Sequence, residues 1–365
     1  MKKFLSLVLC AALCASLFSV ALADNTEAAA KAAAMTLDEL VAAAQTEGTV
    51  NSLGMPDEWA NWKALWDYIT ETYGISHTDT DMSSAEELAK FENEKDNATG
   101  DIGDIGLVMT AVAMEKDLLL PFKTSHWDSI PDWAKEEDGK WIVAYTCTIA
   151  FMVDKDNLKG RPVPTTWKEL KEGGFNVCIG DVIKAAQAYN GVLSAAAALG
   201  GDEGNLQPAI EYFAEIAQAG LLNVNNPMVA NLEMGEADVA IVWDFNALGY
   251  RDQINPDRFE VVIPSDGAVQ SGYASIINKY AKHPYAAMLA REIMLSDLGQ
   301  NFLAEGSARP IREDVALTDE ALAKLLPADM FANANIYNIK DFAVWEATVA
   351  ELADLWQEEV AIYIK

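Results

Sequence analysis

Acidic and aromatic side chains stand together where predicted strands end. The apolar run Val239–Val242 stops at Trp243 and Asp244, and similar combinations recur along the chain. Ligands of open α/β sheets bind beyond the carboxyl ends of the strands, so side chains at such positions face a ligand site. The candidate ligand-binding residues are Asp57, Trp59, Ser83, Ser84, Tyr145, Thr146, Asp181, Trp243, Asp244 and Tyr273.

These residue types fit a small organic cation. Carboxylates supply the counter-charge, and each aromatic face adds up to about 2 kcal/mol of cation–π attraction when the contact is desolvated. The interpretation assigns counter-charge to Asp244, Asp57 and Asp181, and stacking to Trp59, Trp243 and Tyr273. Each residue also has a structural alternative: Asp57 and Asp181 are suitable helix caps, and Trp243 is a suitable core residue.

Two other ligand classes stay open. A phosphorylated anion would use helix N-termini and hydroxyls, which Ser83, Ser84 and Thr146 can supply. Arg309 is the one obvious basic candidate, and structural pairing with an acid is the favoured role for it. Ferric iron is disfavoured because the chain has no Tyr-Tyr pair, although spaced tyrosines could still converge.

The sequence argues against an enzyme and against a metal centre or other cofactor. His77, His126 and His283 show no metal-ligand spacing, and no nucleophile elbow is present. Adjacent acids are common in so acidic a chain and indicate nothing specific. A hydrolase is the remote alternative, and an adhesive protein is disfavoured because no repeats occur.

Strand and helix signals alternate along the chain and predict an α/β protein. A strand over 49–56 precedes a helix with Trp62 and Trp66 on its core face, and 83–86 has the pattern of a capping box. The longest β-like run is 141–155, and a second α/β unit begins after it. The 365 residues suffice for two domains of ordinary size.

The N-terminus has the pattern of a secretory signal peptide. Two lysines, an apolar stretch and Ala21–Ala23 predict cleavage after residue 23, and 24–35 reads as a flexible spacer. Cys10 and Cys14 each follow a leucine rather than a small residue, so soluble export is favoured over a lipid anchor. No later run is long and apolar enough to span a membrane.

The net charge limits the classes of binding partner, and two cysteines leave one question about the mature chain open. The formal net charge of −30 disfavours nucleic acid and anionic lipid as partners, while it attracts cations over long range. Cys147 and Cys178 remain in the mature chain. They form either one disulfide or two buried thiols, and the sequence leaves both open.

Several motifs resemble one known family. The segment SDLGQNFLAEGSARPIRED (296–314) carries the strongest likeness, supported by the helix start at 83–87, the TIAFMVDKDNL strand and GEADVAIVWDF. In these motifs the chain resembles the extracytoplasmic solute-binding proteins of ABC importers with the type 2 fold. Members of that group bind ferric iron, polyamines, thiamine or sugar phosphates.

The resemblance implies two α/β lobes with a ligand cleft between them. Lobe 1 would comprise 36–146 and 274–365, and lobe 2 would comprise 147–273, with crossings near Tyr145–Phe151 and Gly272–Ile276. The C-terminal helices would pack on lobe 1. The expected protein is a periplasmic monomer that closes on a small solute by hinge motion and presents it to an inner-membrane ABC permease.

Overall fold

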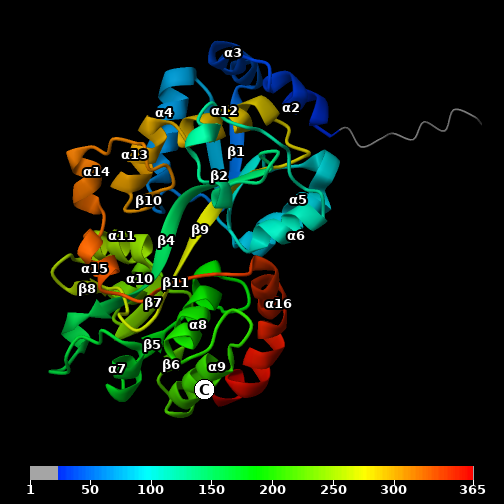
Figure 1. The fold of residues 1–365 in the computed structure, drawn as a ribbon. Helices are drawn as coiled ribbons and strands as arrows, with labels where there is room; N and C mark the ends of the chain where they lie inside the picture. The colour runs from blue at the N-terminus through cyan, green and yellow to red at the C-terminus, as the bar shows by residue number, and fades with distance from the viewer. Residues whose placement is uncertain (1–23, 365) are drawn as a thin grey trace, which may run out of the picture.

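The computed structural model describes residues 24–364 and shows an α/β fold in two lobes (Figure 1). Eleven strands form one connected sheet with the path β2-β1-β3-β9-β4-β7-β5-β6. Their bounds are β1 Thr49–Leu53, β2 Ser76–Thr80, β3 Ile102–Gly106, β4 Trp141–Asp154, β5 Val177–Cys178, β6 Leu222–Asn223, β7 Val239–Trp243, β8 Phe259–Val262, β9 Ala268–Ile277, β10 Arg309–Pro310 and β11 Ile336–Asn338. The predicted fold class is confirmed.

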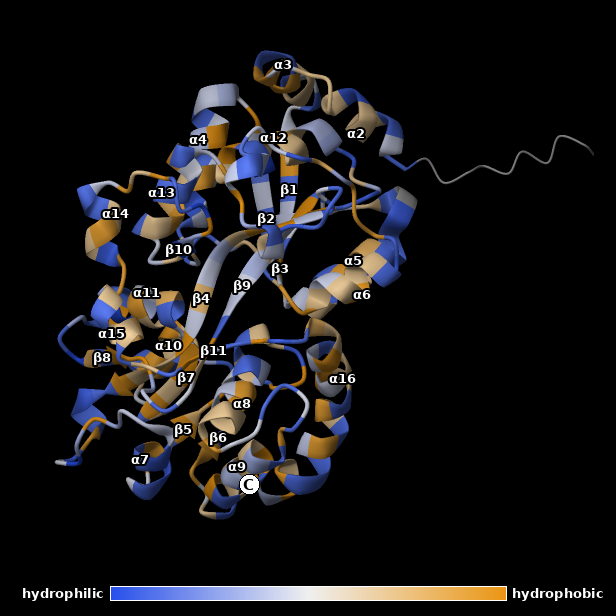
Figure 2. Ribbon diagram, viewed as in Figure 1, coloured by the Kyte–Doolittle hydropathy of each residue, from blue (hydrophilic) through white to orange (hydrophobic). Residues whose placement is uncertain are grey.

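Helices cover the sheet in both lobes. They are α2 Thr26–Ala32, α3 Leu37–Glu47, α4 Trp62–Tyr73, α5 Ser84–Glu94, α6 Met109–Glu115, α7 Trp167–Glu172, α8 Ala186–Ala198, α9 Gln207–Gln218, α10 Val229–Glu233, α11 Asp244–Ile254, α12 Pro284–Met294, α13 Asp297–Glu305, α14 Asp319–Lys324, α15 Ala328–Ala332 and α16 Phe342–Glu359. Figure 2 shows β7 as largely hydrophobic, while α16 alternates between hydrophilic and hydrophobic residues. This pattern is typical of helices that bury one face.

The longest strand, β4, joins the lobes. Its residues 141–148 pair with β9, whereas 149–154 pair with β7 and β8. The change of partners falls inside the segment where the sequence analysis placed the first crossing. Strand β9 runs antiparallel beside β4, so two adjacent strands connect the lobes.

Local sequence signals account for several helix bounds. Helix α3 begins at a capping box, in which Thr36 and Glu39 exchange hydrogen bonds, and ends at Gly48 with φ 72°. Thr36, Glu39 and Gly48 are residue types that begin and end helices at these spacings, so the bounds of α3 follow from the local sequence. Trp62 and Trp66 of α4 are 0% and 2% exposed, as the stripe predicted. Helix α4 begins at Trp62, because residues 57–61 form turns.

Two expectations about the ends of the chain are wrong. Residues 24–35 contain α2 rather than a flexible spacer, because Ala29 and Ala32 are buried and α2 lies against α12. Helix α16 packs mainly on α9 of the second lobe, with the rings of Trp356 and Phe213 5.6 Å apart, and it touches the first lobe only at α6. The chain therefore crosses a third time after α14, and residues 336–364 lie mainly against the second lobe.

The predicted signal peptide, 1–23, lies outside the described residues. Within 24–364 no helix has the length and hydrophobicity needed to cross a membrane. Cys147 and Cys178 are both buried free thiols, so the disulfide alternative is excluded in this structure.

Candidate functional site

A cleft of about 660 Å³ lies between the lobes. The first lobe lines it with Gly54, Glu58, Trp59, Asp81, Met82, Ser83, Ser84, Glu86, Glu87 and Asp104. The second lobe contributes the loop before α8, the start of α10 and the inner face of α11, and Tyr273 of β9 lies between the two groups. We call this space the interlobe cleft.

Five of the predicted residues line the interlobe cleft. They are Trp59, the adjacent Ser83 and Ser84 at the start of α5, Asp181 and Tyr273, and both lobes contribute. Trp59, the two serines and Asp181 follow the carboxyl ends of β1, β2 and β5, as the rule about strand ends predicts, whereas Tyr273 lies within β9.

Trp59 is placed by a strained turn. The two residues that follow it, Ala60 and Asn61, have left-handed backbones with φ of 47° and 58°. Such conformations persist in non-glycine residues only where the surroundings hold them. Asn61 donates a hydrogen bond to the Phe302 carbonyl at 3.1 Å, and Trp59 itself packs edge-on against Phe245 of the second lobe.

The remaining predicted residues lie outside the lining. Asp57 is exposed and lines a separate hollow of about 500 Å³ on the first lobe. Thr146 is buried in β4 opposite Arg309 of β10. The Arg309 guanidinium lies 4.5 Å from the centre of the Phe331 ring, away from the cleft lining. The expected pairing with an acid does not take the form of a salt bridge among residues 24–364, where the guanidinium contacts the Phe331 ring and the Leu326 carbonyl.

Asp244 is turned away from the cleft, contrary to the prediction that it faces a ligand. Its carboxylate accepts hydrogen bonds from the backbone N–H groups of Thr148 and Phe245, each at 3.0 Å. Burial raises the pKa of Asp244 to about 6, although those bonds and the positive charge of Arg309 oppose the rise. The residue therefore fixes the start of α11 against β4, and the strand-end rule could not reveal which way its side chain turns.

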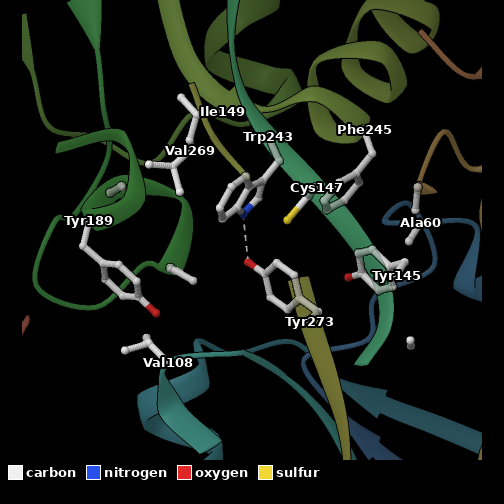
Figure 3. Close-up of a cluster of buried hydrophobic side chains, with 14 of the residues drawn as sticks. Ala60, Val108, Tyr145, Cys147, Ile149, Tyr189, Trp243, Phe245, Val269 and Tyr273 are labelled. Atoms are coloured by element: carbon white, nitrogen blue, oxygen red, sulfur yellow. Dashed lines mark hydrogen bonds between the residues drawn. The ribbon is translucent and has the colours of Figure 1, made fainter. Parts of the chain in front are cut away.

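An aromatic cluster supports the floor of the cleft (Figure 3). Trp243 is 1% exposed, and its indole N–H donates to the Tyr273 hydroxyl at 3.1 Å. The Tyr145 and Tyr273 rings stack with their centres 5.6 Å apart. Trp243 and Tyr145 are thus core residues that position Tyr273, while Tyr273 reaches the cleft.

The tyrosines that could have converged on ferric iron do gather in this cluster, since Tyr189 lies near Tyr273 (Figure 3). Burial raises the pKa of all three phenols, Tyr145, Tyr189 and Tyr273, above the ordinary value. Ferric iron requires the ionised phenolate, so the surroundings oppose that form of binding. Within 24–364 no group of three or more His, Cys, Asp or Glu side chains is arranged to hold a metal ion.

Sequence reasoning missed the most buried acids of the site. Glu87 of α5 and Asp104 of β3 line the interlobe cleft and are 1% and 2% exposed. Burial is the main cause that raises the pKa of Asp104 to about 8 and that of Glu87 well above its usual range. Asp104 lies within a run of glycines and isoleucines that is typical of a buried strand. A carboxyl group is rarely buried in such a strand, and this unusual placement was the signal in the sequence that could have revealed the residue.

Glycines make room for the Glu87 carboxyl group. A Cβ atom at Gly54 or Gly103 would overlap the oxygens of Glu87, and Gly54 also has φ of 66°. These two glycines let β1 and β3 approach the carboxyl group closely. The site therefore depends on residues that carry no side chain.

Known proteins resemble this chain in sequence and in fold. A sulfate-binding protein from Salmonella typhimurium strain LT2 is 28% identical over 206 residues. The match covers 52% of this chain and 61% of that protein, so the chain spans less than two thirds of the curated relative's length. A shared fold does not fix the ligand, so sulfate binding is a property of that relative.

Two solved structures share the fold at lower identity. The periplasmic binding protein AfuA from Actinobacillus pleuropneumoniae, solved with fructose-6-phosphate, has a TM-score of 0.68 at 18% identity and covers 86% of this chain and 98% of its own. Iron-bound HitA from Pseudomonas aeruginosa has a TM-score of 0.64 at 16% identity and covers 85% and 98%. The sequence pattern described as bacterial extracellular solute-binding protein matches residues 106–335, more than half of the chain. The chain therefore belongs to the bacterial extracellular solute-binding protein family, as its motifs predicted.

Proposed function

We propose that the protein captures a small organic cation, of the amine or polyamine class, in the interlobe cleft. Membership of a solute-binding family confirms that the role is binding rather than catalysis. The proposed setting is the periplasm, where a monomer with its signal removed would deliver the solute to an inner-membrane ABC permease. Hinge closure about β4 and β9 would enclose the ligand.

The charge of the cleft lining carries the proposal. Its seven acidic residues face a single basic side chain, Lys184. The acids are Glu58, Asp81, Glu86, Glu87, Asp104, Asp181 and Glu233. Because a cleft with low-dielectric walls concentrates the field of its own charges, this lining favours a cation over an anion.

Aromatic and apolar groups complete a site for an organic cation. Trp59, Tyr250 and Tyr273 lie around the cleft, with Met82 and Val229 between them. Aromatic faces attract cations and also bury the methylene groups of an amine. A bare metal ion would make no use of these surfaces.

A second candidate, an oxyanion, has one specific observation in its favour. The N-termini of α5 and α8, helices of 11 and 13 residues, both reach the cleft, with Ser84 and Lys184 beside them. Helix N-termini bind anions readily, and the matched relative is a sulfate-binding protein. Glu86 occupies the first turn of α5, however, and its negative charge competes with an anion there.

A thermal-shift comparison separates the two candidates. Ligand that binds the native state raises the melting temperature by mass action, so the protein is heated with spermidine, sulfate, fructose-6-phosphate or ferric citrate. The proposal expects a rise with spermidine that Trp59→Ala diminishes. A rise with sulfate or fructose-6-phosphate alone, abolished by Lys184→Ala, would instead establish the anion site.

A further inference from the structure

Two carboxyl groups at the floor of the interlobe cleft lack a positive partner. The Asp104 backbone N–H donates to Glu87 Oε2 at 3.2 Å, and the Tyr145 hydroxyl donates to Asp104 Oδ2 at 2.7 Å. The other oxygen, Asp104 Oδ1, is buried and has no hydrogen-bond partner among residues 24–364. An orphaned buried acceptor is rare in a native protein and calls for an explanation.

The surroundings of this pair add negative or neutral groups only. Asp79 of β2 and Asp81 before α5 raise the pKa of Glu87 further, and Tyr145 donates to Asp104 from β4. Cys147 of β4 and Tyr273 of β9 face Asp104 as neutral groups whose own pKa values are raised. Strand β1 presents no ionisable side chain, and Glu115 of α6 is exposed at the far end of that helix.

Basic side chains nearby are engaged elsewhere or lie across the cleft. His77 of β2 shares a hydrogen bond with Ser52 at 2.8 Å, and burial lowers its pKa to about 4, so it is neutral at physiological pH. Lys184 belongs to the opposite lobe and favours ionisation of Glu86. In the part of the chain that the structure describes, no salt bridge involves Glu87 or Asp104.

Ionising two buried carboxyl groups without a cation beside them costs much free energy, because desolvation and mutual repulsion both disfavour the charged forms. The empty cleft therefore holds at least one proton on the pair. A ligand cation would reverse this balance, because it supplies the missing positive charge at the same place.

We propose that Glu87 and Asp104 form the subsite for a primary or secondary ammonium group, and that the arriving ammonium displaces a proton from the pair into solvent. The O–H bond of one carboxylic acid breaks, its proton leaves with water, and the ammonium N–H donates to Asp104 Oδ1. Asp104 Oδ1 lacks a hydrogen-bond donor, and a quaternary ammonium has no N–H group to offer. The subsite therefore discriminates against quaternary ammonium ions. This inference rests on the proposed function and locates its charge recognition.

Calorimetry with spermidine measures the displaced proton. Titrations at pH 7 in PIPES and in HEPES, which differ in ionisation heat and carry no primary or secondary amine, give the number of protons released per ligand bound. We expect about one, together with an association constant that rises roughly tenfold per pH unit between 6 and 8. Tetramethylammonium should bind at least tenfold more weakly than spermidine.

Variants assign the proton to the pair. Asp104→Asn keeps the shape and can still accept from Tyr145, yet it should abolish proton release and flatten the pH dependence. Asp57→Asn removes one carboxylate of the same lobe outside the cleft, so it should preserve both the proton release and the pH dependence of binding.

The outcomes separate this inference from the proposed function. Spermidine binding without proton release, or unchanged proton release in Asp104→Asn, would overturn the subsite while leaving amine capture intact. Absence of binding by any amine from pH 6 to 9 would overturn both proposals. Proton release by the wild type, lost in Asp104→Asn and kept in Asp57→Asn, would support both.

Discussion

Replacing Asp104 with asparagine should make stability less dependent on pH. The pKa of Asp104 rises from 3.8 to about 8 on folding, chiefly because the carboxyl group loses its water. At 1.36 kcal/mol per pKa unit, ionising this group in the folded protein costs roughly 6 kcal/mol. This is an upper bound, since water in the cleft relaxes around the charge and screens it.

The sign follows from the direction of the pKa change. A raised folded pKa means that the folded state binds the proton more tightly, so its contribution to stability is complete below about pH 4. That contribution is lost progressively as the pH rises towards 8. Asp104→Asn cannot ionise, so we expect it to gain stability relative to the wild type as the pH increases.

Calorimetric melting of ligand-free protein at pH 5, 7 and 9 tests this reasoning. The difference in melting temperature between Asp104→Asn and wild type should grow in favour of the variant by several degrees from pH 5 to pH 9. Asp57→Asn serves as the matched control and should show no such growth. A difference that stays constant from pH 5 to 9 would refute the claim that Asp104 is protonated in the empty cleft.

Three further substitutions test the roles assigned to individual residues. Trp243→Phe removes the hydrogen bond to Tyr273 and should lower stability by about 1 kcal/mol in thermal unfolding. Asp244→Ala leaves two buried backbone N–H groups without their acceptor, so it should cost roughly 1 to 3 kcal/mol while spermidine affinity stays within about twofold; a large loss of affinity would return this residue to the ligand site. Gly103→Ala places a Cβ atom against the Glu87 carboxyl group and should weaken spermidine binding at least tenfold by calorimetry, whereas unchanged affinity would contradict the placement of that group.

Alternation of strand and helix signals was sufficient to predict the fold, because each element buries a face that its own period reveals. The capping boxes at Thr36 and Ser83 marked helix starts for the same local reason. Which lobe a helix covers is not a local property. The apolar face of α16 would fit either lobe, and its packing on α9 became clear only in three dimensions.

The same contrast between local features and tertiary packing explains which residues of the candidate site could be predicted. Strand ends are local features, so the sequence could predict that Trp59 and Asp181, which follow β1 and β5, line the cleft. Side-chain direction at a strand end depends on neighbouring backbone donors, and those donors turn Asp244 inward. Glu87 lay within a correctly predicted helix start, yet only its approach to β1 and β3 shows that its carboxyl group is buried.

The charge of the whole chain and the charge of the cleft act at different stages of binding. A net charge of −30 attracts any cation to the surface, and salt screens that attraction over about 10 Å. Glu87 and Asp104 are too buried for such screening, so their preference for a cation persists at high ionic strength. Selectivity among cations then depends on the orphaned oxygen of Asp104, because only a ligand with an N–H donor satisfies it. The acidic surface would raise the association rate of cations in general, and the Glu87–Asp104 pair would determine which cations bind tightly.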